Sequence, residues 1–259
     1  MGFYDLSRNE RIELVKKIQS DIIEAFELAD TTEQAVKVPG IIILYASDND
    51  TYIRKGAYTS IGRIYFEKTD LRPNILVTIS NMLINPDYKV RQTAVYSLGE
   101  IGKKDADSIM KIFESALEDE HHSVRNAVIG SMKQMGQKNP KPTLKLVKKY
   151  LHNPNPQIRR EMIHGIELRG RTHPEDVLPL LKELEWDDNN EVKNMVVHVA
   201  GQISYKDGCL EKVIHHLNTW KNRKLVTEIV DEILDVHKRY QFASKSPEEA
   251  QNYIKLNLS

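Results

Sequence analysis

Hydrophobic residues are spaced along this chain in a way that predicts amphipathic helices. After Arg91, apolar residues stand three, four and seven positions further on, at Ala94, Val95 and Leu98. This spacing places them on one face of a helix, which can then pack against its neighbours. The same pattern begins at Arg54, Arg125, Arg159 and Lys193, with a degenerate copy at Val226, and the steps between copies are 37, 34, 34, 34 and 33 residues. The pattern thus predicts a helical unit that repeats along most of the chain.

A second amphipathic run precedes each of these helices. Before Arg91 it comprises Ile75, Leu76, Ile79 and Leu83. The polar pair Asn85-Pro86 separates the two runs, and such residues start turns and cap helices. Each unit is therefore predicted to be an outer helix, a turn and an inner helix, and the chain an all-α solenoid of about six such pairs.

Both ends of the chain are predicted to carry a helix outside the repeat. Ser7 and Glu10 have the spacing of a capping box before a long helix, and Ser246 precedes a last short one. Terminal elements of a solenoid must turn a polar side to water. We expect a capping helix in residues 1–34, a repeat array in residues 35–242 and a capping helix in residues 243–259.

Composition agrees with a well-solvated helical protein. The 259 residues carry 37 basic and 37 acidic side chains, which favours an ordered globular surface. No apolar run approaches the roughly 18 residues of a membrane span, and no secretory signal pattern begins the chain. Cys209 is the single cysteine, so no internal disulfide can form. We expect a cytoplasmic protein that does not cross a membrane.

The segment Val90–Gly102 resembles the HEAT repeat, especially its phycobilisome-lyase-like variety, in which Val-Arg is followed at fixed spacing by Ala, Leu and two Gly. Residues 53–64 match next best, and the resemblance extends over residues 35–242. It implies an armadillo-like right-handed superhelix whose inner helices line a concave face that holds other macromolecules. It also implies that signature residues such as Asp87 and Arg91 are structural, the acid capping the inner helix and the arginine bonding to a neighbouring repeat.

The candidate binding surface is the polar stripe of the inner helices. Positions one, five and nine after each repeat origin share one helical face opposite the apolar stripe. Amide, imidazole and hydroxyl groups gather there and can hydrogen-bond a partner of either charge. We predict as partner-binding Arg63, Tyr96, Glu100, Gln134, Arg160, His164, Asn194, His198, Gln202 and Asp231. A solvated helix face must be polar in any case, so each of these residues could equally be ordinary surface.

Positive charge is concentrated between residues 133 and 171, which contain ten basic and two acidic side chains. Such a patch is a plausible footprint for phosphates or for an acidic protein. Its candidate anion-binding or nucleic-acid-binding residues are Lys138, Lys141, Lys145, Lys148, Lys149, Arg169 and Arg171. Lysine on outer helix faces also serves solubility alone, so both interpretations stay open.

The sequence carries no recognisable catalytic motif. It has no glycine-rich phosphate loop, no His-Glu-x-x-His and no Gly-x-Ser-x-Gly. His164 and His198 occupy the same position in adjacent repeats, with Asp231 in the next, but a metal that spanned three repeats would be strained. We predict no catalytic residues, no metal site, no cofactor and no small-molecule substrate.

The sequence therefore predicts a non-catalytic scaffold or adaptor that binds a protein partner on its concave face. The alternative is a nucleic-acid-binding protein that uses the basic 133–171 region and is similar in shape to the HEAT-like alkylpurine DNA glycosylases. The resemblance to those enzymes implies an acidic residue that is flanked by tryptophan and lies in a groove. Here Trp186 and Trp220 have no acid of the predicted stripe beside them, which makes glycosylase activity the weaker reading.

Overall fold

The computed structural model describes residues 2–28 and 38–259, and within them the chain forms helices and turns without any strand. The all-helical prediction is confirmed. The expected boundary between residues 34 and 35 lies outside the described residues. The helices divide into two compact units, one up to Ser131 and one from Met132 to Ser259, so the division falls within α7 (His122–Lys138).

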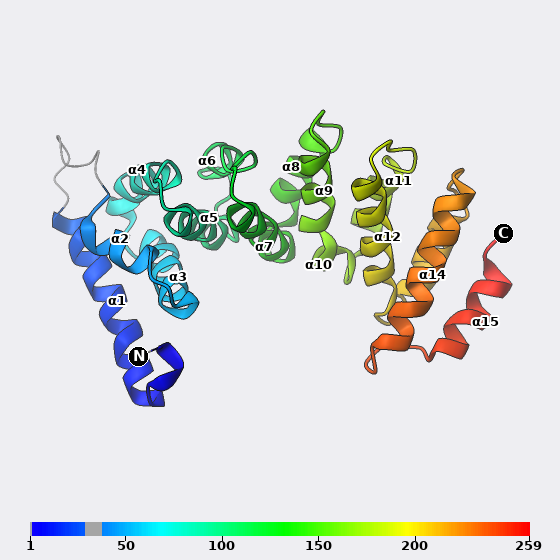
Figure 1. Cartoon of the computed structure of the whole chain (residues 1–259), viewed down its shortest axis with the longest axis horizontal. Helices are drawn as coiled ribbons and strands as arrows, with labels where there is room; N and C mark the ends of the chain where they lie inside the picture. Colours follow the sequence, from blue (N-terminus) through cyan, green and yellow to red (C-terminus); the bar gives the residue numbers. More distant parts are fainter. Residues whose placement is uncertain (1, 29–37) are drawn as a thin grey trace. The chain divides into compact units, whose positions relative to one another are not determined.

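In the first unit, short outer helices alternate with longer inner ones (Figure 1). Its elements before α7 are η1 (Phe3–Asp5), α1 (Arg8–Leu28), α2 (Gly40–Ala46), α3 (Thr51–Glu67), η3 (Thr69–Leu71), α4 (Arg72–Leu83), α5 (Tyr88–Gly102) and α6 (Met110–Glu114). Helix α3 packs against both α1 and α5, and α4 packs on α5. The helix predicted before the repeats is therefore present, and Ser7 and Glu10 form its capping box.

The second unit continues the same alternation. Its elements after α7 are α8 (Pro140–Tyr150), α9 (Pro156–Gly165), α10 (Glu167–Gly170), α11 (Pro174–Lys182), α12 (Asn190–Ser204), α13 (Cys209–Leu217), α14 (Arg223–Arg239) and α15 (Pro247–Asn257). Helix α12 packs between α9 and α14, and α15 packs against α13 and α14. The predicted last helix is α15, whose capping box joins Ser246 and Glu249.

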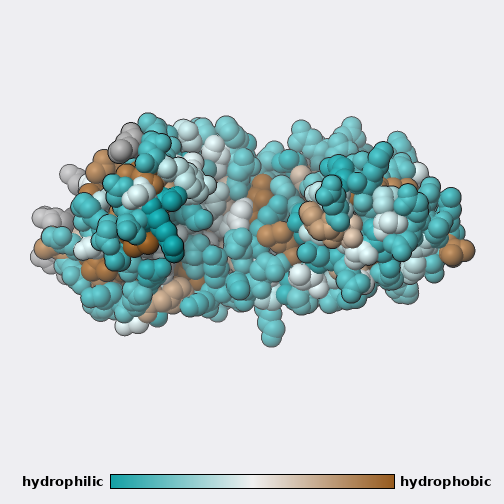
Figure 2. Space-filling model, turned by 90° about the horizontal axis from the view of Figure 1, so that it is seen from below, coloured by the Kyte–Doolittle hydropathy of each residue, from teal (hydrophilic) through white to brown (hydrophobic). Residues whose placement is uncertain are grey.

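We call α3, α5, α7, α9, α12 and α14 the inner helices, because each is the second helix of its pair. Their apolar stripes form the core: Ala94, Val95 and Leu98 are all 0% exposed. Removing such side chains from water supplies most of the stabilisation of a helix that is too short to be stable alone. On the face seen in Figure 2, hydrophilic residues predominate and hydrophobic ones form separate patches.

The inner helices begin at side-chain caps. Asp50 and Asp87 accept hydrogen bonds from the backbone N–H groups of Tyr52 and Lys89. Where the signature acid is replaced, Asn155 and Asn189 fill the same role for α9 and α12. Each cap satisfies backbone donors that have no partner within the helix.

The arginine at the repeat origin also has a structural role. Arg91 forms a two-pronged ion pair with Asp119, and Arg159 forms the same pair with Asp187, in each case 28 residues further along the chain. The remaining guanidinium nitrogen of each arginine, Nη1, donates to a backbone carbonyl in the turn before its own inner helix. For Arg91 this carbonyl belongs to Asn85. The structural role implied by the HEAT resemblance is confirmed for these residues.

Candidate functional sites on the inner helices

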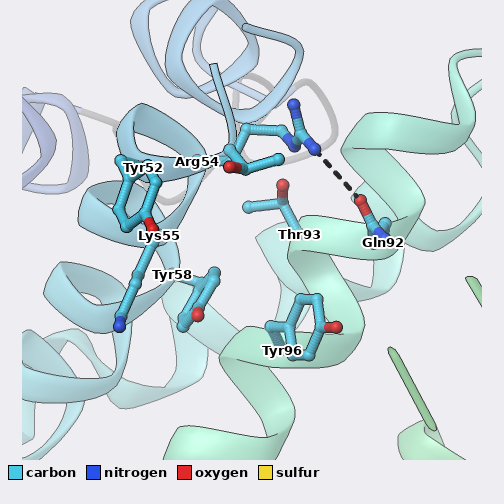
Figure 3. Close-up of a pocket in the computed structure, with 8 residues that line it drawn as sticks. Tyr52, Arg54, Lys55, Tyr58, Gln92, Thr93 and Tyr96 are labelled. Carbon is cyan, nitrogen blue, oxygen red and sulfur yellow. Dashed lines mark hydrogen bonds between the residues drawn. The ribbon is translucent and has the colours of Figure 1, made fainter. Parts of the chain in front are cut away.

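A pocket of about 200 Å³ lies between α3 and α5 in the first unit (Figure 3). Its lining residues are Thr51, Tyr52, Arg54, Lys55, Tyr58, Gln92, Thr93 and Tyr96. The rings of Tyr58 and Tyr96 stack with centroids 5.0 Å apart. Burial raises the pKa of Tyr58 to about 12 and raises that of Tyr96 as well. Both phenols are therefore neutral at physiological pH and can donate as well as accept hydrogen bonds.

More aromatic side chains gather beside this pocket. Phe3 stacks on Tyr52 with ring centroids 5.6 Å apart, and Tyr4 meets Tyr52 edge-on at 4.5 Å. Tyr4 is 63% exposed and Tyr52 is 39% exposed. Exposed aromatic rings beside an arginine, here Arg54, are typical of protein-binding surfaces.

Two other predicted residues of the first unit are in contacts within the chain. Arg63 on α3 donates a hydrogen bond to Gln19 on α1. Glu100 on α5 pairs with Lys103 at 2.7 Å. Of the partner-binding residues predicted in this unit, Tyr96 lines the pocket and Arg63 and Glu100 do not.

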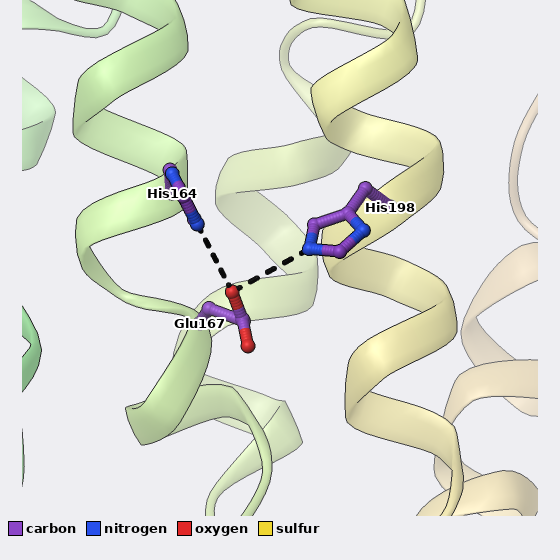
Figure 4. Close-up of side chains that lie close together, drawn as sticks. All are labelled: His164, Glu167 and His198. Atoms are coloured by element: carbon purple, nitrogen blue, oxygen red, sulfur yellow. Dashed lines mark ion pairs between the residues drawn. The ribbon is translucent and has the colours of Figure 1, made fainter. Parts of the chain in front are cut away.

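In the second unit, a polar cluster is centred on the carboxylate of Glu167, at the start of α10. This side chain is 3% exposed. Its Oε2 atom lies 2.9 Å from Lys133 Nζ, 3.3 Å from His164 Nε2 and 3.7 Å from His198 Nε2, and Arg171 binds its Oε1 atom. Figure 4 shows the two imidazoles from α9 and α12 turned toward this carboxylate.

Glu167 is charged despite its burial. Burial by itself raises the pKa of a carboxyl group, but the contacts with His164, His198 and Lys133 outweigh it and hold the pKa of Glu167 well below its usual range. A buried carboxylate needs such partners, because an uncompensated charge in the interior costs several kcal/mol. The charged state of Glu167 therefore depends on the lysine, arginine and imidazole groups around it.

The cluster occupies the position where other repeats have glycine. Eight residues after the repeat origin stand Gly62, Gly99 and Gly201, where an added Cβ would come within about 2.5 Å of the next inner helix. The same position holds Lys133 in α7 and Glu167 at the start of α10. Close backbone packing is therefore replaced there by an ion pair.

The inner helix is also interrupted at this point. Helix α9 ends at Gly165 and α10 begins at Glu167, with Ile166 between them as a turn. A Cβ at Gly165 would lie 2.8 Å from the side chain of Met132. The absence of a side chain at Gly165 lets the chain pass close to α7 and then place Glu167 inside.

The remaining predicted residues of the second unit divide by burial. Arg160 and Asn194 line a shallow depression together with Glu191 and Met195. Gln134 on α7 and Asp231 on α14 are exposed. Gln202 differs from the expectation of an exposed stripe, because it is 2% exposed and accepts hydrogen bonds from Arg171 and from the Tyr240 hydroxyl.

The predicted basic patch separates into two groups. Lys138, Lys141, Lys145, Lys148 and Lys149 are exposed at the end of α7 and along α8. Arg169 instead pairs with Asp176, and Arg171 pairs with Glu167. The two arginines therefore contribute little positive charge to the patch, which is reduced to the lysines.

Both tryptophans lie outside the inner helices. Trp220 is 3% exposed and donates its indole N–H to His216. Trp186 is 68% exposed just after the outer-layer helix α11, in the turn that precedes α12. Cys209 is 4% exposed.

Comparison with known proteins agrees with this architecture. The family model for HEAT repeats matches residues 75–147, so the resemblance predicted from Val90–Gly102 is confirmed over that segment. No curated protein matches the chain.

Several solved structures are similar to this chain. AlkD2 from Streptococcus mutans is 16% identical over 88% of this chain and 99% of that one, with a TM-score of 0.48. The archaeal HEAT-like repeats protein from Thermococcus onnurineus NA1 is 19% identical over 87% and 97%, with a TM-score of 0.38. The complex of CpcE and CpcF of phycocyanin lyase from Nostoc sp. PCC7120 is 16% identical over 95% and 93%, with a TM-score of 0.36.

Among the described residues, no helix combines the length and the apolar character needed to cross a membrane. The sequence analysis named His164, His198 and Tyr96, and it did not name Lys133, Glu167 and Tyr58, which the structure places beside them. Lys133 and Glu167 could have been recognised in the sequence, because they replace the glycine that other repeats have eight residues after the repeat origin. Tyr58 stands four residues after Arg54, a position of the apolar stripe, and a tyrosine at such a position gives no sign that its hydroxyl reaches a pocket.

Proposed function

We propose that this protein is a non-catalytic scaffold that binds a protein partner along the exposed face of its inner helices. The observation that carries the proposal is the pocket between α3 and α5, where stacked tyrosines meet basic side chains. Tyrosine supplies large contact area at low entropic cost, and both tyrosine and arginine are enriched among the residues that dominate binding energy in protein interfaces.

The chemistry of this pocket favours an acidic segment of the partner. Arg54 and Lys55 supply positive charge, while Tyr58 and Tyr96 supply apolar area with hydroxyl groups that can donate to a carboxylate. Gln92 adds an amide, whose N–H already donates to the Ser123 carbonyl. An extended acidic segment carrying an apolar side chain would satisfy these groups together.

The test is affinity capture from native lysate with the wild type and with Tyr58→Ala/Tyr96→Ala. Trp186→Ala is the matched control, since it removes an exposed aromatic side chain outside the inner helices. A partner captured by the wild type and the control, but reduced at least tenfold by the double variant, supports the proposal. Equal capture by all three proteins contradicts it.

A second candidate function is nucleic-acid binding by α8. Lys141, Lys145, Lys148 and Lys149 follow a spacing of four, three and one residues, which places them along one side of the helix, and all four are exposed. Phosphate contacts of this kind give an affinity that falls steeply with salt. Reversal of charge at Lys145, Lys148 and Lys149 to Glu abolishes such binding, whereas salt-independent binding or no binding removes this candidate.

Nuclease treatment distinguishes the two functions. Capture that survives nuclease but depends on Tyr58 and Tyr96 is protein binding through the pocket. Capture that disappears with nuclease and depends on the α8 lysines places nucleic acid first.

A further inference from the structure

His164, Glu167 and His198 converge in the second unit although they come from three separate helices, α9, α10 and α12. One ligand atom of each residue lies within 4.8 Å of the ligand atoms of the other two. Two imidazole nitrogens and one carboxylate oxygen form a common ligand set of zinc sites that keep a fourth position open. From this geometry we propose that the three side chains bind a divalent transition metal, with Zn²⁺ as the fitting ion.

One of the distances between these ligand atoms already has the value expected for a zinc site, and the other distances are close to it. Zn²⁺ holds nitrogen and oxygen ligands at about 2.0–2.2 Å in a tetrahedron, so neighbouring ligand atoms lie about 3.3 Å apart. The Oε2 atom of Glu167 lies 3.3 Å from His164 Nε2 and 3.7 Å from His198 Nε2. A movement of His198 Nε2 by a few tenths of an ångström toward Glu167 would bring the second distance to the same value.

Neighbouring side chains hold the ligands in place. Arg171 binds the other oxygen of Glu167 and also donates to Gln202 at 2.8 Å, which leaves Oε2 facing the imidazoles. Glu232 Oε1 lies 3.9 Å from Nδ1 of His198, on the side of the ring away from Glu167. A carboxylate that accepts a hydrogen bond from the outer nitrogen of a metal-bound histidine orients the ring and raises its basicity. Glu232 would take this role only after moving closer, because 3.9 Å exceeds hydrogen-bond distance.

Lys133 occupies the place of the cation in the structure. Its ammonium lies 2.9 Å from Glu167 Oε2 and 2.9 Å from His164 Nε2. An ammonium can only donate hydrogen bonds, so in this contact His164 Nε2 presents its lone pair, the form that binds metals, and does not donate to Glu167 at the same time. Lys133 and the metal therefore compete for the same atoms.

Both the ion and the lysine have a route to solvent. The side chain of His198 is 42% exposed and that of Lys133 is 20% exposed. Lys133 can swing outward when the metal enters, and a water molecule can take the fourth position on the exposed side. The bound metal would then join α9 and α10 to α12.

The experiment titrates the full-length protein with Zn²⁺ against a chromophoric chelator, and with Co²⁺ for its tetrahedral absorption bands. The wild type is expected to bind one ion per chain, His198→Ala to bind at least tenfold more weakly, and Lys133→Met at least tenfold more tightly. His152→Ala is the matched control, because His152 forms an exposed pair with Glu183 at 2.9 Å that has no third ligand. Circular dichroism checks that each variant is folded.

Several results would overturn the proposal. One is the absence of Zn²⁺ binding by the wild type. Others are unchanged binding by folded His198→Ala and weaker binding by folded Lys133→Met. A loss of binding in His152→Ala would place the ion on the surface instead. Because the pocket between α3 and α5 shares no residue with this site, these results leave the proposed partner binding untouched.

Discussion

At the scale of the residue, the eighth position of the repeat decides how closely two inner helices approach. Gly99 illustrates the tight arrangement: an added Cβ would lie 2.7 Å from Ser131 Cβ and 3.2 Å from its Cα. A contact with backbone cannot be relieved by rotation of a side chain. The helices would therefore have to move apart or repack.

This crowding predicts that Gly99→Ala destabilises the protein by about 1–3 kcal/mol, even though alanine improves helix propensity by up to about 1 kcal/mol. Gly136→Ala is the matched control in another inner helix, because its Cβ would meet only ordinary contacts at 3.7 Å. Urea denaturation followed by circular dichroism should show a lower midpoint for Gly99→Ala and an equal or higher one for Gly136→Ala. If Gly99→Ala instead raised the urea midpoint, the two inner helices would be able to move apart without a loss of stability.

At the scale of the element, ion pairs from the repeat origin join the start of an inner helix to the turn of the next repeat. The pair between Arg159 and Asp187 has side chains only 12% and 5% exposed. Burial raises the pKa of Asp187, but the Arg159 guanidinium and the Asn189 N–H outweigh it, so the pKa is lower than usual. Asp119 beside Arg91 has the same downward shift for the same reasons.

A lowered folded-state pKa gives the pH dependence a definite sign. The stabilisation is complete above the unfolded-state pKa of aspartate, about 3.9, and is lost as the pH falls below it toward the folded-state value. Asp187→Asn should therefore lower the free energy of unfolding by about 3 kcal/mol at pH 7, and the difference from wild type should shrink at pH 3.

Denaturation at the two pH values measures this effect. Glu175→Gln is the control, since Glu175 pairs with Lys212 at an exposed site where both side chains are more than half accessible, and it should change stability by less than about 1 kcal/mol. A difference between wild type and Asp187→Asn that stays constant from pH 7 to pH 3 would show that the ion pair is not its source.

At the scale of the whole molecule, the described residues form two compact units, and the division between them in the sequence falls within α7. In repeat proteins each element contacts mainly its neighbours, so stability is close to a sum of local terms. The chain is therefore expected to respond locally to damage in its core.

This locality predicts the effect of Ile61→Ala, which empties a fully buried position in α3. The loss of about 2–5 kcal/mol should speed amide exchange in α3 to α5, as measured by hydrogen exchange and mass spectrometry, and leave α12 to α14 unchanged. Ile233→Ala in α14 should give the reverse pattern. Equal acceleration in both units would show that the molecule unfolds as one cooperative body.

The pattern of hydrophobic and polar residues is enough to predict the helices, their pairing in repeats and the caps, whereas the structural role of the origin arginine was implied by the HEAT resemblance. These features depend on spacing within one helix or on neighbouring repeats, as with Asp87, Arg91 and the stripe Ala94, Val95 and Leu98. A periodic pattern reports them directly, because each copy solves the same packing problem.

Which polar side chains come into contact is set by the packing of helices that are distant in the sequence. Lys133, Glu167 and Arg171 are drawn into one cluster by the turn at Ile166 and by contacts between helices more than 30 residues apart in the sequence. Burial of Gln202 follows from the same packing. A helical pattern shows which face is polar, but the depth of that face depends on the distance between adjacent helices, and residues on both helices set that distance.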